Sequence, residues 1–314
     1  MKILVTELMW KEGLDVLSRV ADVNYDKSLS EKYDELLQMV KDVDAMVIRN
    51  QTMITPLLLE KAKQLKVIGR LGVGLDNIDI QACKERGITV VYAHNANAIS
   101  VAEYVMNVIL SFRRNLYEAN ASVKQGKWDR QQFTGNEIYG KTLGLVGVGE
   151  IAHRIAKRAF AFGMEVIGYD PFRSTYDFSV AETGIRLVTF EELLSKSDFI
   201  SIHVPLLPTT KKMFNIDIFK LMKSSSCLIN TSRGGIIDEH ALNEALNNQY
   251  IAGAYLDVFG IEPPDEDNEL LLNNKANLTP HIAGLTEESQ IRTSVLVANE
   301  VLKVMNGESS LFSV

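Results

Sequence analysis

Residues 143 to 152 read LGLVGVGEIA, and this stretch decides the fold. A short apolar strand runs into the pattern G-x-G-x-x-A, which starts at Gly147 and Gly149 and opens a helical stretch. Glycines there permit a tight turn and a close approach of the backbone to a pyrophosphate, whose charge a helix N-terminus favours. The order of strand, turn and helix therefore favours dinucleotide binding over glycines that serve packing alone.

The next expected strand supplies the matching acid. It covers residues 165–169 and ends in Asp170, about 20 residues after Gly149, which is the spacing of a ribose-binding carboxylate. Such a carboxylate accepts hydrogen bonds from both adenosine ribose hydroxyls and repels a 2′-phosphate. We therefore expect NAD as the cofactor rather than NADP, with the nearby Arg173 weakening that preference.

The same alternation of strand and helix continues along the whole chain. A first series of strands is expected at residues 3–5, 45–48, 66–68 and 88–91, and a second at 143–146, 166–169, 199–202, 227–230 and 252–256. Helical spacing lies between the strands of each series. This pattern predicts the α/β class, with open parallel sheets covered by helices on both faces.

Two longer helices complete the expected fold. One covers residues 100–124 and separates the two series, with Ser100 as the N-cap and Glu103 completing a capping box. The other covers residues 287–305 and is expected to pack back on the first domain.

Composition excludes several classes of protein. The chain has 314 residues, 46% of them hydrophobic and 23% charged, which suits a two-domain globular protein. With a net charge of −7 and no polybasic run, we expect no nucleic-acid or membrane partner. Cys83 and Cys227 suit a reducing compartment, and Glu7 interrupts any signal peptide, so we expect a cytoplasmic protein. No pair of residues has the spacing of metal ligands, so no metal is expected.

Polar residues follow three of the expected strands, where a doubly wound sheet binds its ligands. Arg233 lies on a glycine-containing turn, where it suits the capture of a carboxylate and equally suits the capping of a helix. Asp257 and Glu262 precede a Pro-Pro pair. His281 follows another strand and suits acid–base work, but spacing alone does not choose between it and His203.

Six motifs together resemble the NAD-dependent D-2-hydroxyacid dehydrogenase family. They are GRLGVGLDNID at 69–79, NANAISVAE at 95–103, the glycine turn at 147–152, NTSRGG at 230–235, DVFGIEPP at 257–264 and PHIAG at 280–284. The phosphoglycerate dehydrogenase branch is the most similar, in a short form without a C-terminal regulatory domain.

The resemblance implies a site and a domain organisation. The catalytic residues would be Arg233, Glu262 and His281. Cofactor contacts would fall at Val73, Gly147, Gly149, Glu150, Ile151, Asp170, Val204, Thr231, Asp257 and Gly284. Two Rossmann-like domains, residues 1–97 with 286–314 for the substrate and 98–285 for NAD, would enclose a cleft, and a homodimer would form through the helix near 100–120. NADH would transfer hydride to a 2-oxo acid, or NAD would accept it from a 2-hydroxy acid.

Two departures from the family pattern affect the cofactor. Ala152 stands where a third glycine is commoner, and Glu150 stands where many relatives carry Arg, which removes a cation near the pyrophosphate.

The substrate is expected to carry a second anionic group. Arg49, Arg70 and Arg130 would join Arg233 around it, with the backbone of Val73 and Gly74 holding the carboxylate. This favours 3-phosphoglycerate first and sulfolactate second, although Met53 stands where the phosphate-specific branch has a further cation. The alternatives are a glyoxylate/hydroxypyruvate reductase, a D-lactate dehydrogenase and, from another class, a non-catalytic NAD(H)-sensing scaffold.

Overall fold

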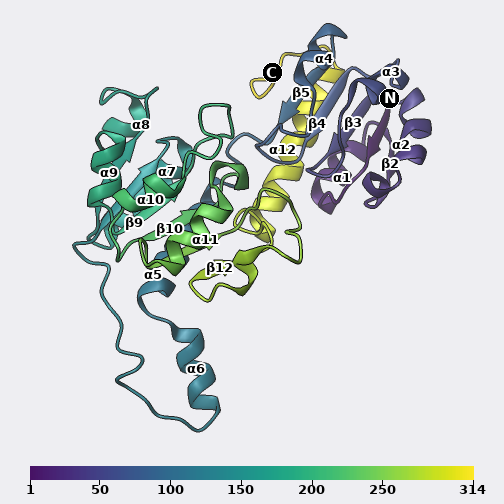
Figure 1. The fold of residues 1–314 in the computed structure, drawn as a ribbon. Coiled ribbons are helices and arrows are strands. Elements are labelled where there is room, and N and C mark those ends of the chain that lie inside the picture. Colours follow the sequence, from purple (N-terminus) through teal and green to yellow (C-terminus); the bar gives the residue numbers. More distant parts are fainter. The chain divides into compact units, whose positions relative to one another are not determined.

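The computed structural model describes the backbone of residues 1–314 and every side chain except those of residues 178 and 179. The chain forms two compact units (Figure 1). Unit 1 consists of Met1–Asn97 and Leu285–Val314, and unit 2 of Ala98–Gly284. Each unit is built on one sheet in which all pairs of named strands are parallel. The α/β class expected from the alternating pattern is therefore confirmed.

Unit 1 contains a five-stranded sheet in the order β2-β1-β3-β4-β5. The strands are β1 Lys2–Val5, β2 Asp22–Tyr25, β3 Ala45–Ile48, β4 Val67–Arg70 and β5 Thr89–Tyr92. The helices are α1 Lys11–Ser18, α2 Tyr33–Met39, α3 Pro56–Lys61, α4 Ile80–Glu85 and α12 Glu287–Met305, with short 3₁₀ turns at Leu29–Glu31 and Val40–Asp42. The sequence does not predict the edge strand β2, because its residues are mostly exposed and form no apolar run.

Helix α12 returns from the far end of the chain to cover the unit 1 sheet, as the sequence predicts. A Cβ atom at Gly69 of β4 would lie 2.6 Å from Cγ2 of Val301 and 2.7 Å from Cγ1 of Val297. The backbone N–H of Trp10, just before α1, donates to Oγ of Ser294 at 3.1 Å. Only glycine at position 69 permits this close approach of helix to strand.

Unit 2 contains a seven-stranded sheet in the order β12-β11-β10-β9-β6-β7-β8. The strands are β6 Thr142–Val146, β7 Glu165–Tyr169, β8 Arg186–Leu187, β9 Phe199–Ile202, β10 Cys227–Asn230, β11 Gly253–Leu256 and β12 Ala276–Leu278. The helices are α5 Ala98–Arg113, α6 Leu116–Lys124, α7 Glu150–Ala161, α8 Phe178–Ala181, α9 Phe190–Lys196, α10 Ile216–Leu221 and α11 Glu239–Asn247, with 3₁₀ turns at Gly234–Ile236 and Glu269–Leu272. The chain reverses its direction of winding between β6 and β9, which is the switch point where such sheets bind ligands.

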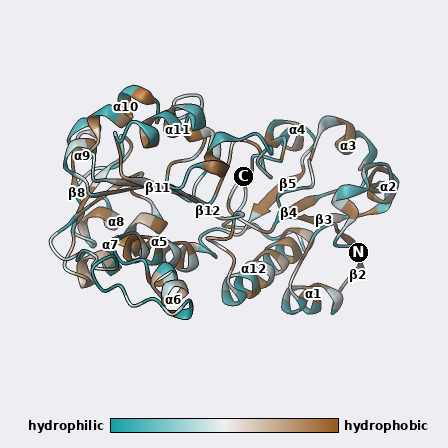
Figure 2. Cartoon of the chain, turned by 60° about the horizontal axis from the view of Figure 1, so that its bottom comes forward, coloured by the Kyte–Doolittle hydropathy of each residue, from teal (hydrophilic) through white to brown (hydrophobic). Residues whose placement is uncertain are grey.

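Hydropathy follows the layers of each unit. The strands are largely hydrophobic, whereas the helices carry hydrophilic residues on one side and hydrophobic residues on the other (Figure 2). The apolar sides of the helices pack on the sheets and form the cores. Among the helices that the structure describes, none has both the length and the apolar character needed to cross a membrane.

The prediction of a single helix over residues 100–124 is wrong in two respects, which concern its continuity and its start. This segment does not form one helix. It consists of two helices, because Asn115 caps the second one by accepting a hydrogen bond from the N–H of Glu118 at 3.2 Å. The first helix begins at Ala98, so Ser100 lies inside it and is buried rather than serving as the N-cap.

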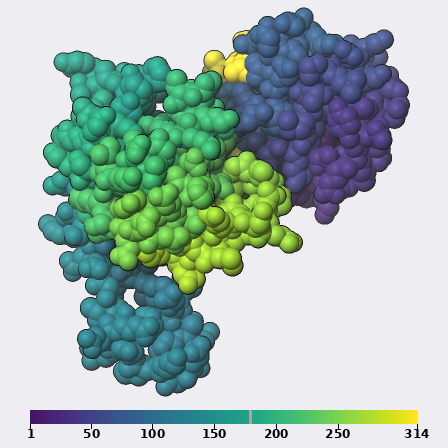
Figure 3. All heavy atoms as spheres, in the orientation of Figure 1, coloured from purple at the N-terminus to yellow at the C-terminus, as the bar shows by residue number. Residues whose placement is uncertain are grey.

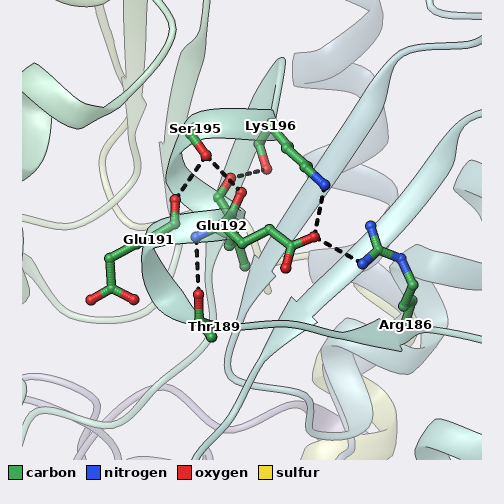
Figure 4. A network of polar contacts seen from close by, with 8 residues as sticks. Arg186, Thr189, Glu191, Glu192, Ser195 and Lys196 are labelled. Carbon is green, nitrogen blue, oxygen red and sulfur yellow. Dashed lines mark hydrogen bonds and ion pairs between the residues drawn. The ribbon is translucent and has the colours of Figure 1, made fainter.

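The edge strand β8 is tied to the helix that follows it. Glu192 of α9 forms ion pairs with Arg186 of β8 at 3.0 Å and with Lys196 at 2.9 Å (Figure 4). Thr189 caps α9 by accepting a hydrogen bond from the N–H of Glu192. The two cations lower the pKa of the Glu192 carboxyl, their hydrogen bonds being the main cause. With only two residues, β8 has too short an apolar run to be predicted from sequence.

Candidate active site

The glycine turn lies at the switch point of unit 2. The structure gives a different reason for glycine at each of its two positions, 147 and 149. Gly147 has φ +90°, and a Cβ atom there would lie 2.9 Å from the carbonyl carbon of His203 after β9. At Gly149, the N-cap of α7, a Cβ atom would meet nothing within 4 Å. Protein packing therefore requires the first glycine, while the second leaves open space at a helix N-terminus, which suits a phosphate group.

Asp170 lies beside this turn at the end of β7. Its Oδ2 accepts a hydrogen bond from the N–H of Val148 at 2.9 Å, and its Oδ1 accepts one from the N–H of Phe172, also at 2.9 Å. Each carboxylate oxygen has a further lone pair for a ribose hydroxyl.

The remaining polar groups near the turn fit a bound dinucleotide. The hydroxyl of Thr231, which follows β10, is buried and has no partner among the described residues. Glu150, at the first position of α7, pairs with Arg154 at 2.6 Å, so its charge near a pyrophosphate is partly compensated. In the part of the chain with described side chains, no group of three or more His, Cys, Asp or Glu residues is arranged to hold a metal ion.

A histidine and a carboxylate form a direct pair in unit 2. Nδ1 of His281 and Oε2 of Glu262 lie 2.8 Å apart, and Oε1 of Glu262 accepts the N–H of Phe259 at 3.1 Å. Burial alone would raise the pKa of Glu262, but the hydrogen bond and charge of His281, the Phe259 N–H and the charge of Arg233 together lower it. Glu262 is therefore held as a carboxylate beside the imidazole ring.

The buried carboxylate of Asp257, at the end of β11, fixes the turn that carries His281. Its Oδ1 accepts hydrogen bonds from the hydroxyl of Thr279 at 2.6 Å and from the N–H of Ile282 at 2.8 Å. Its Oδ2 accepts the N–H of Ala283 at 2.8 Å. His281 itself has φ +54°, a left-handed conformation that a non-glycine residue seldom adopts.

Sequence reasoning did not identify Tyr104 of α5 as part of this arrangement. Its hydroxyl lies 2.6 Å from the hydroxyl of Thr279, which itself donates to Asp257. Because the Thr279 hydroxyl donates its single proton to Asp257, the hydroxyl of Tyr104 is the donor in this contact. Burial raises the pKa of Tyr104, so the phenol stays protonated. A tyrosine more than 150 residues before its partner gives no sequence signal of this contact.

Arg233 lies on a turn that is fastened to the loop before Glu262. Nδ2 of Asn230 donates to the carbonyl of Arg233 at 2.9 Å, and a Cβ atom at Gly234 would lie 1.9 Å from the carbonyl carbon of Phe259. The structure thus brings the turn of Arg233 against the 259–260 backbone, and the charge of Arg233 acts on Glu262.

His203, the other candidate histidine, has a different environment. Its Nε2 lies 2.8 Å from the hydroxyl of the fully buried Ser201. Burial of the ring lowers the pKa of His203 to about 3, so the imidazole is neutral at physiological pH. Residue spacing leaves the choice between the two histidines open. The buried environment of His203 favours His281 as the acid–base group.

Two arginines lie at the carboxyl edge of the unit 1 sheet. Arg70 ends β4, and its partner in the register is Ile48, the residue before Arg49. The guanidinium of Arg49 donates to Oε1 of Gln290 at 2.7 Å, and that of Arg70 donates to the carbonyl of Leu71 at 2.9 Å.

The remaining predicted contacts lie on loops and at a helix start. In unit 1, the N–H groups of Val73 and Gly74 donate to no acceptor among the described residues. In unit 2, Ile151 lies in the first turn of α7 and Val204 beside the glycine turn. Arg130 is exposed on the loop after α6. Gly284 is the last residue of unit 2.

Comparison with known proteins identifies the family. Residues 106–283 match the NAD binding domain of the D-isomer specific 2-hydroxyacid dehydrogenases. The chain belongs to this family.

Individual relatives cover nearly the whole chain. It is 46% identical over 309 residues to a D-3-phosphoglycerate dehydrogenase of Methanocaldococcus jannaschii, covering 98% of this chain and 58% of that protein. It is 39% identical to a hydroxypyruvate reductase of Thermotoga maritima, covering 96% and 97% of the two chains. The crystal structure of the TT0316 protein from Thermus thermophilus superposes with a TM-score of 0.91 over the full length of both chains, at 31% identity. The chain thus spans little more than half of the phosphoglycerate dehydrogenase it matches.

We predict that Asp170→Ala weakens NAD binding and relaxes the discrimination against NADP. The substitution removes both the acceptors for the ribose hydroxyls and the charge that repels a 2′-phosphate. Dissociation constants for NADH and NADPH, measured by fluorescence titration, test this. Glu165→Ala, which removes one charge at the opposite, exposed end of β7, should leave both constants unchanged. An unaltered ratio of the two constants in Asp170→Ala would show that Asp170 does not face the ribose.

Proposed function

We propose that the chain is an NAD-dependent D-2-hydroxyacid dehydrogenase in which Arg233, Glu262 and His281 are the catalytic residues. The observation that carries this proposal is the pair of His281 and Glu262, 2.8 Å apart within the same unit as the glycine turn. The family to which the chain belongs supports the same reaction. The two cysteines are buried and free, which agrees with a cytoplasmic location.

When bound, NADH supplies hydride to the carbonyl carbon of a 2-oxo acid. His281 donates the proton to the oxygen that becomes the hydroxyl. Because its Nδ1 is engaged with Glu262, the proton leaves from Nε2. The Glu262 carboxylate orients the ring and stabilises its protonated form before transfer. In the opposite direction, neutral His281 takes the proton of the hydroxyl.

Arg233 and a backbone loop bind the substrate carboxylate in this proposal. The guanidinium of Arg233 binds the carboxylate and polarises the carbonyl group, for which a planar, permanently charged side chain is suited. In unit 1, the N–H groups of Val73 and Gly74 donate to no described residue and are therefore candidate donors to a substrate carboxylate. The space above Gly149, the Thr231 hydroxyl and Asp170 bind the dinucleotide.

Turnover distinguishes an enzyme from an NAD(H)-sensing scaffold. The protein should consume NADH when mixed with a panel of 2-oxo acids, as followed by loss of NADH absorbance. His281→Ala should lower kcat about 10²–10⁴-fold while NADH still binds, because it removes the proton donor. His240→Ala is the matched control, since His240 forms an exposed pair with Glu269 at 3.2 Å. Binding of NADH without turnover in the unmodified protein would favour the scaffold.

We propose further that the substrate carries a second anionic group, with 3-phosphoglycerate and its 2-oxo acid first and sulfolactate second. Arg49 directly follows β3 and Arg70 ends the neighbouring strand β4, so unit 1 has two guanidinium groups near the carboxyl edge of its sheet. Arg130, on the loop after α6, is a further candidate contact. A phosphate or sulfonate is the chemistry that such a set of guanidinium groups binds. A hydroxypyruvate or glyoxylate reductase is the alternative, supported by the Thermotoga relative.

Arg49→Ala and Arg70→Ala should each lower kcat/KM for 3-phosphohydroxypyruvate about 10–100-fold, the range for a charged hydrogen bond, and much less for pyruvate. Added salt should likewise lower kcat/KM more for 3-phosphohydroxypyruvate than for pyruvate, because screening weakens the attraction between charges. Arg19→Ala, at an exposed arginine after α1, controls for the loss of charge alone. Equal efficiency on both substrates would indicate a reductase of small 2-oxo acids.

We propose that the protein is a homodimer that buries α6. This helix contains no buried residue, and α6 and the loop after it stand away from the rest of unit 2 (Figures 1 and 3). Leu116 and Tyr117 are 69% and 76% exposed, and Trp128 on the following loop is 79% exposed. A helix of nine residues is marginal in water by itself, so a covering surface is needed. A second copy of the chain supplies it.

Sedimentation velocity tests the dimer. The unmodified protein should sediment as a species of twice the chain mass, and Tyr117→Asp should shift it toward the monomer because it places a charge in the apolar contact. Leu272→Asp, at a leucine that is 89% exposed on another part of unit 2, should leave the mass unchanged. A monomer for the unmodified chain would contradict the proposal.

A further inference from the structure

Unit 1 has a switch point of its own, and a protein carboxylate lies there. The strand order reverses between β1 and β3, so the loops after these two strands meet at the carboxyl edge. Glu7, two residues after β1, is 3% exposed. Its Oε1 accepts the N–H groups of Arg49 and Thr52 at 2.8 and 2.9 Å, and its Oε2 accepts those of Asn50 and Gln51 at 3.2 and 3.0 Å.

One carboxylate thus accepts four consecutive backbone N–H groups. Residues 49–52 belong to no helix or strand, so these donors have no partner in a ladder. Hydrogen bonds to a charged acceptor are stronger than those between neutral groups. Among the described residues, no cation forms an ion pair with Glu7. The N–H groups of the 49–52 loop are therefore the groups that compensate its negative charge.

Other buried side chains hold the carbonyl groups of the same loop. Nδ2 of Asn77 donates to the carbonyl of Arg49 at 3.1 Å and to that of Thr52 at 2.7 Å. The hydroxyls of Thr6 and Thr52 lie 2.7 Å apart. The loop after β3 is therefore fixed at both its N–H and its carbonyl groups.

Arg49 is the residue whose position this arrangement determines. Glu7 binds its N–H, Asn77 binds its carbonyl, and Gln290 of α12 binds its guanidinium at 2.7 Å. Burial lowers the pKa of Arg49, and the negative charge of Glu7 opposes that effect. The guanidinium is held charged and in one place before any ligand arrives, which reduces the entropy lost on binding.

We propose that Glu7 is a positioning residue for substrate binding, which holds the 49–52 loop so that the Arg49 side chain faces the second anionic group of the substrate. Because Glu7 already occupies the four N–H groups, the loop backbone does not bind the anion, and the side chain of Arg49 does. The inference rests on the proposed function, since it takes Arg49 as a substrate contact.

Glu7→Gln tests this in the full chain, because it keeps the shape and replaces one pair of acceptors by an NH₂ group that faces two donors. KM for 3-phosphohydroxypyruvate should rise about tenfold, while kcat and the NADH dissociation constant change less than about twofold, as for a loss of uniform substrate binding. Hydrogen exchange followed by mass spectrometry should become faster in the peptide that contains residues 49–52.

Glu300→Gln is the matched control in the same unit. Glu300 is 4% exposed and accepts hydrogen bonds from Lys303 and Ser310 near the end of α12. This variant should lose stability to a similar degree, with KM and the exchange of residues 49–52 unchanged. An equal rise of KM in both variants, or a loss of stability without a change of KM in Glu7→Gln, would overturn the proposal.

A double variant separates this proposal from the proposed function. If Glu7 acts through Arg49, then Glu7→Gln should add little to KM in the Arg49→Ala background, and a full additional effect overturns the inference. If Arg49→Ala alone leaves KM unchanged, Arg49 is not a substrate contact, and the proposed function fails at that point instead. Should Glu7→Gln not fold, Glu7→Asp retains the charge with a shorter reach, and unchanged KM together with faster exchange at 49–52 would overturn the role.

Discussion

Backbone N–H groups that follow a parallel strand have no neighbouring strand to bond to, and in this chain single carboxylates accept them. Glu7 accepts four from residues 49–52, Asp257 accepts two from residues 282 and 283, and Asp170 accepts one from the glycine turn and one from its own loop. All three acids lie just after a strand. These carboxylates hold the loops that carry Arg49 and His281 and the glycine turn, whereas the amide of Asn230 holds the turn of Arg233.

The central strands of both sheets and the edge strand β5 could be predicted from the sequence, and the edge strands β2 and β8 could not. Central parallel strands are buried on both faces and appear as short apolar runs, as in β3 with Ala45–Ile48. The edge strands β2 and β8 are exposed or only two residues long, so neither has such a run. The break between α5 and α6 depends on one side chain, Asn115, which competes with the helix for a backbone N–H.

The sequence predicts which residues form the candidate site. It does not predict which of their side chains contact one another. Parallel strands place polar residues at one edge, so Arg233, Glu262 and His281 were expected there. The choice between two histidines needed their surroundings, because one ring meets a carboxylate and the other meets the buried hydroxyl of Ser201. Glu7 appeared in the sequence only as an acid near the N-terminus. Its bonds to residues more than 40 positions away follow from the strand order β1-β3, which no local pattern encodes.

The position of helix α12 in the sequence determines when unit 1 can finish folding during synthesis of the chain. It packs against β4 at Gly69 but follows all of unit 2 in the chain. At about 5–20 residues per second, the ribosome needs roughly 10–40 s to make unit 2 after the first 97 residues are complete. Throughout that interval helix α1 covers only part of the apolar sheet face of the nascent unit 1, and the part around Gly69 of β4 waits for residues 285–314. Unit 2 has all of its residues first, and unit 1, although it begins first, is completed last.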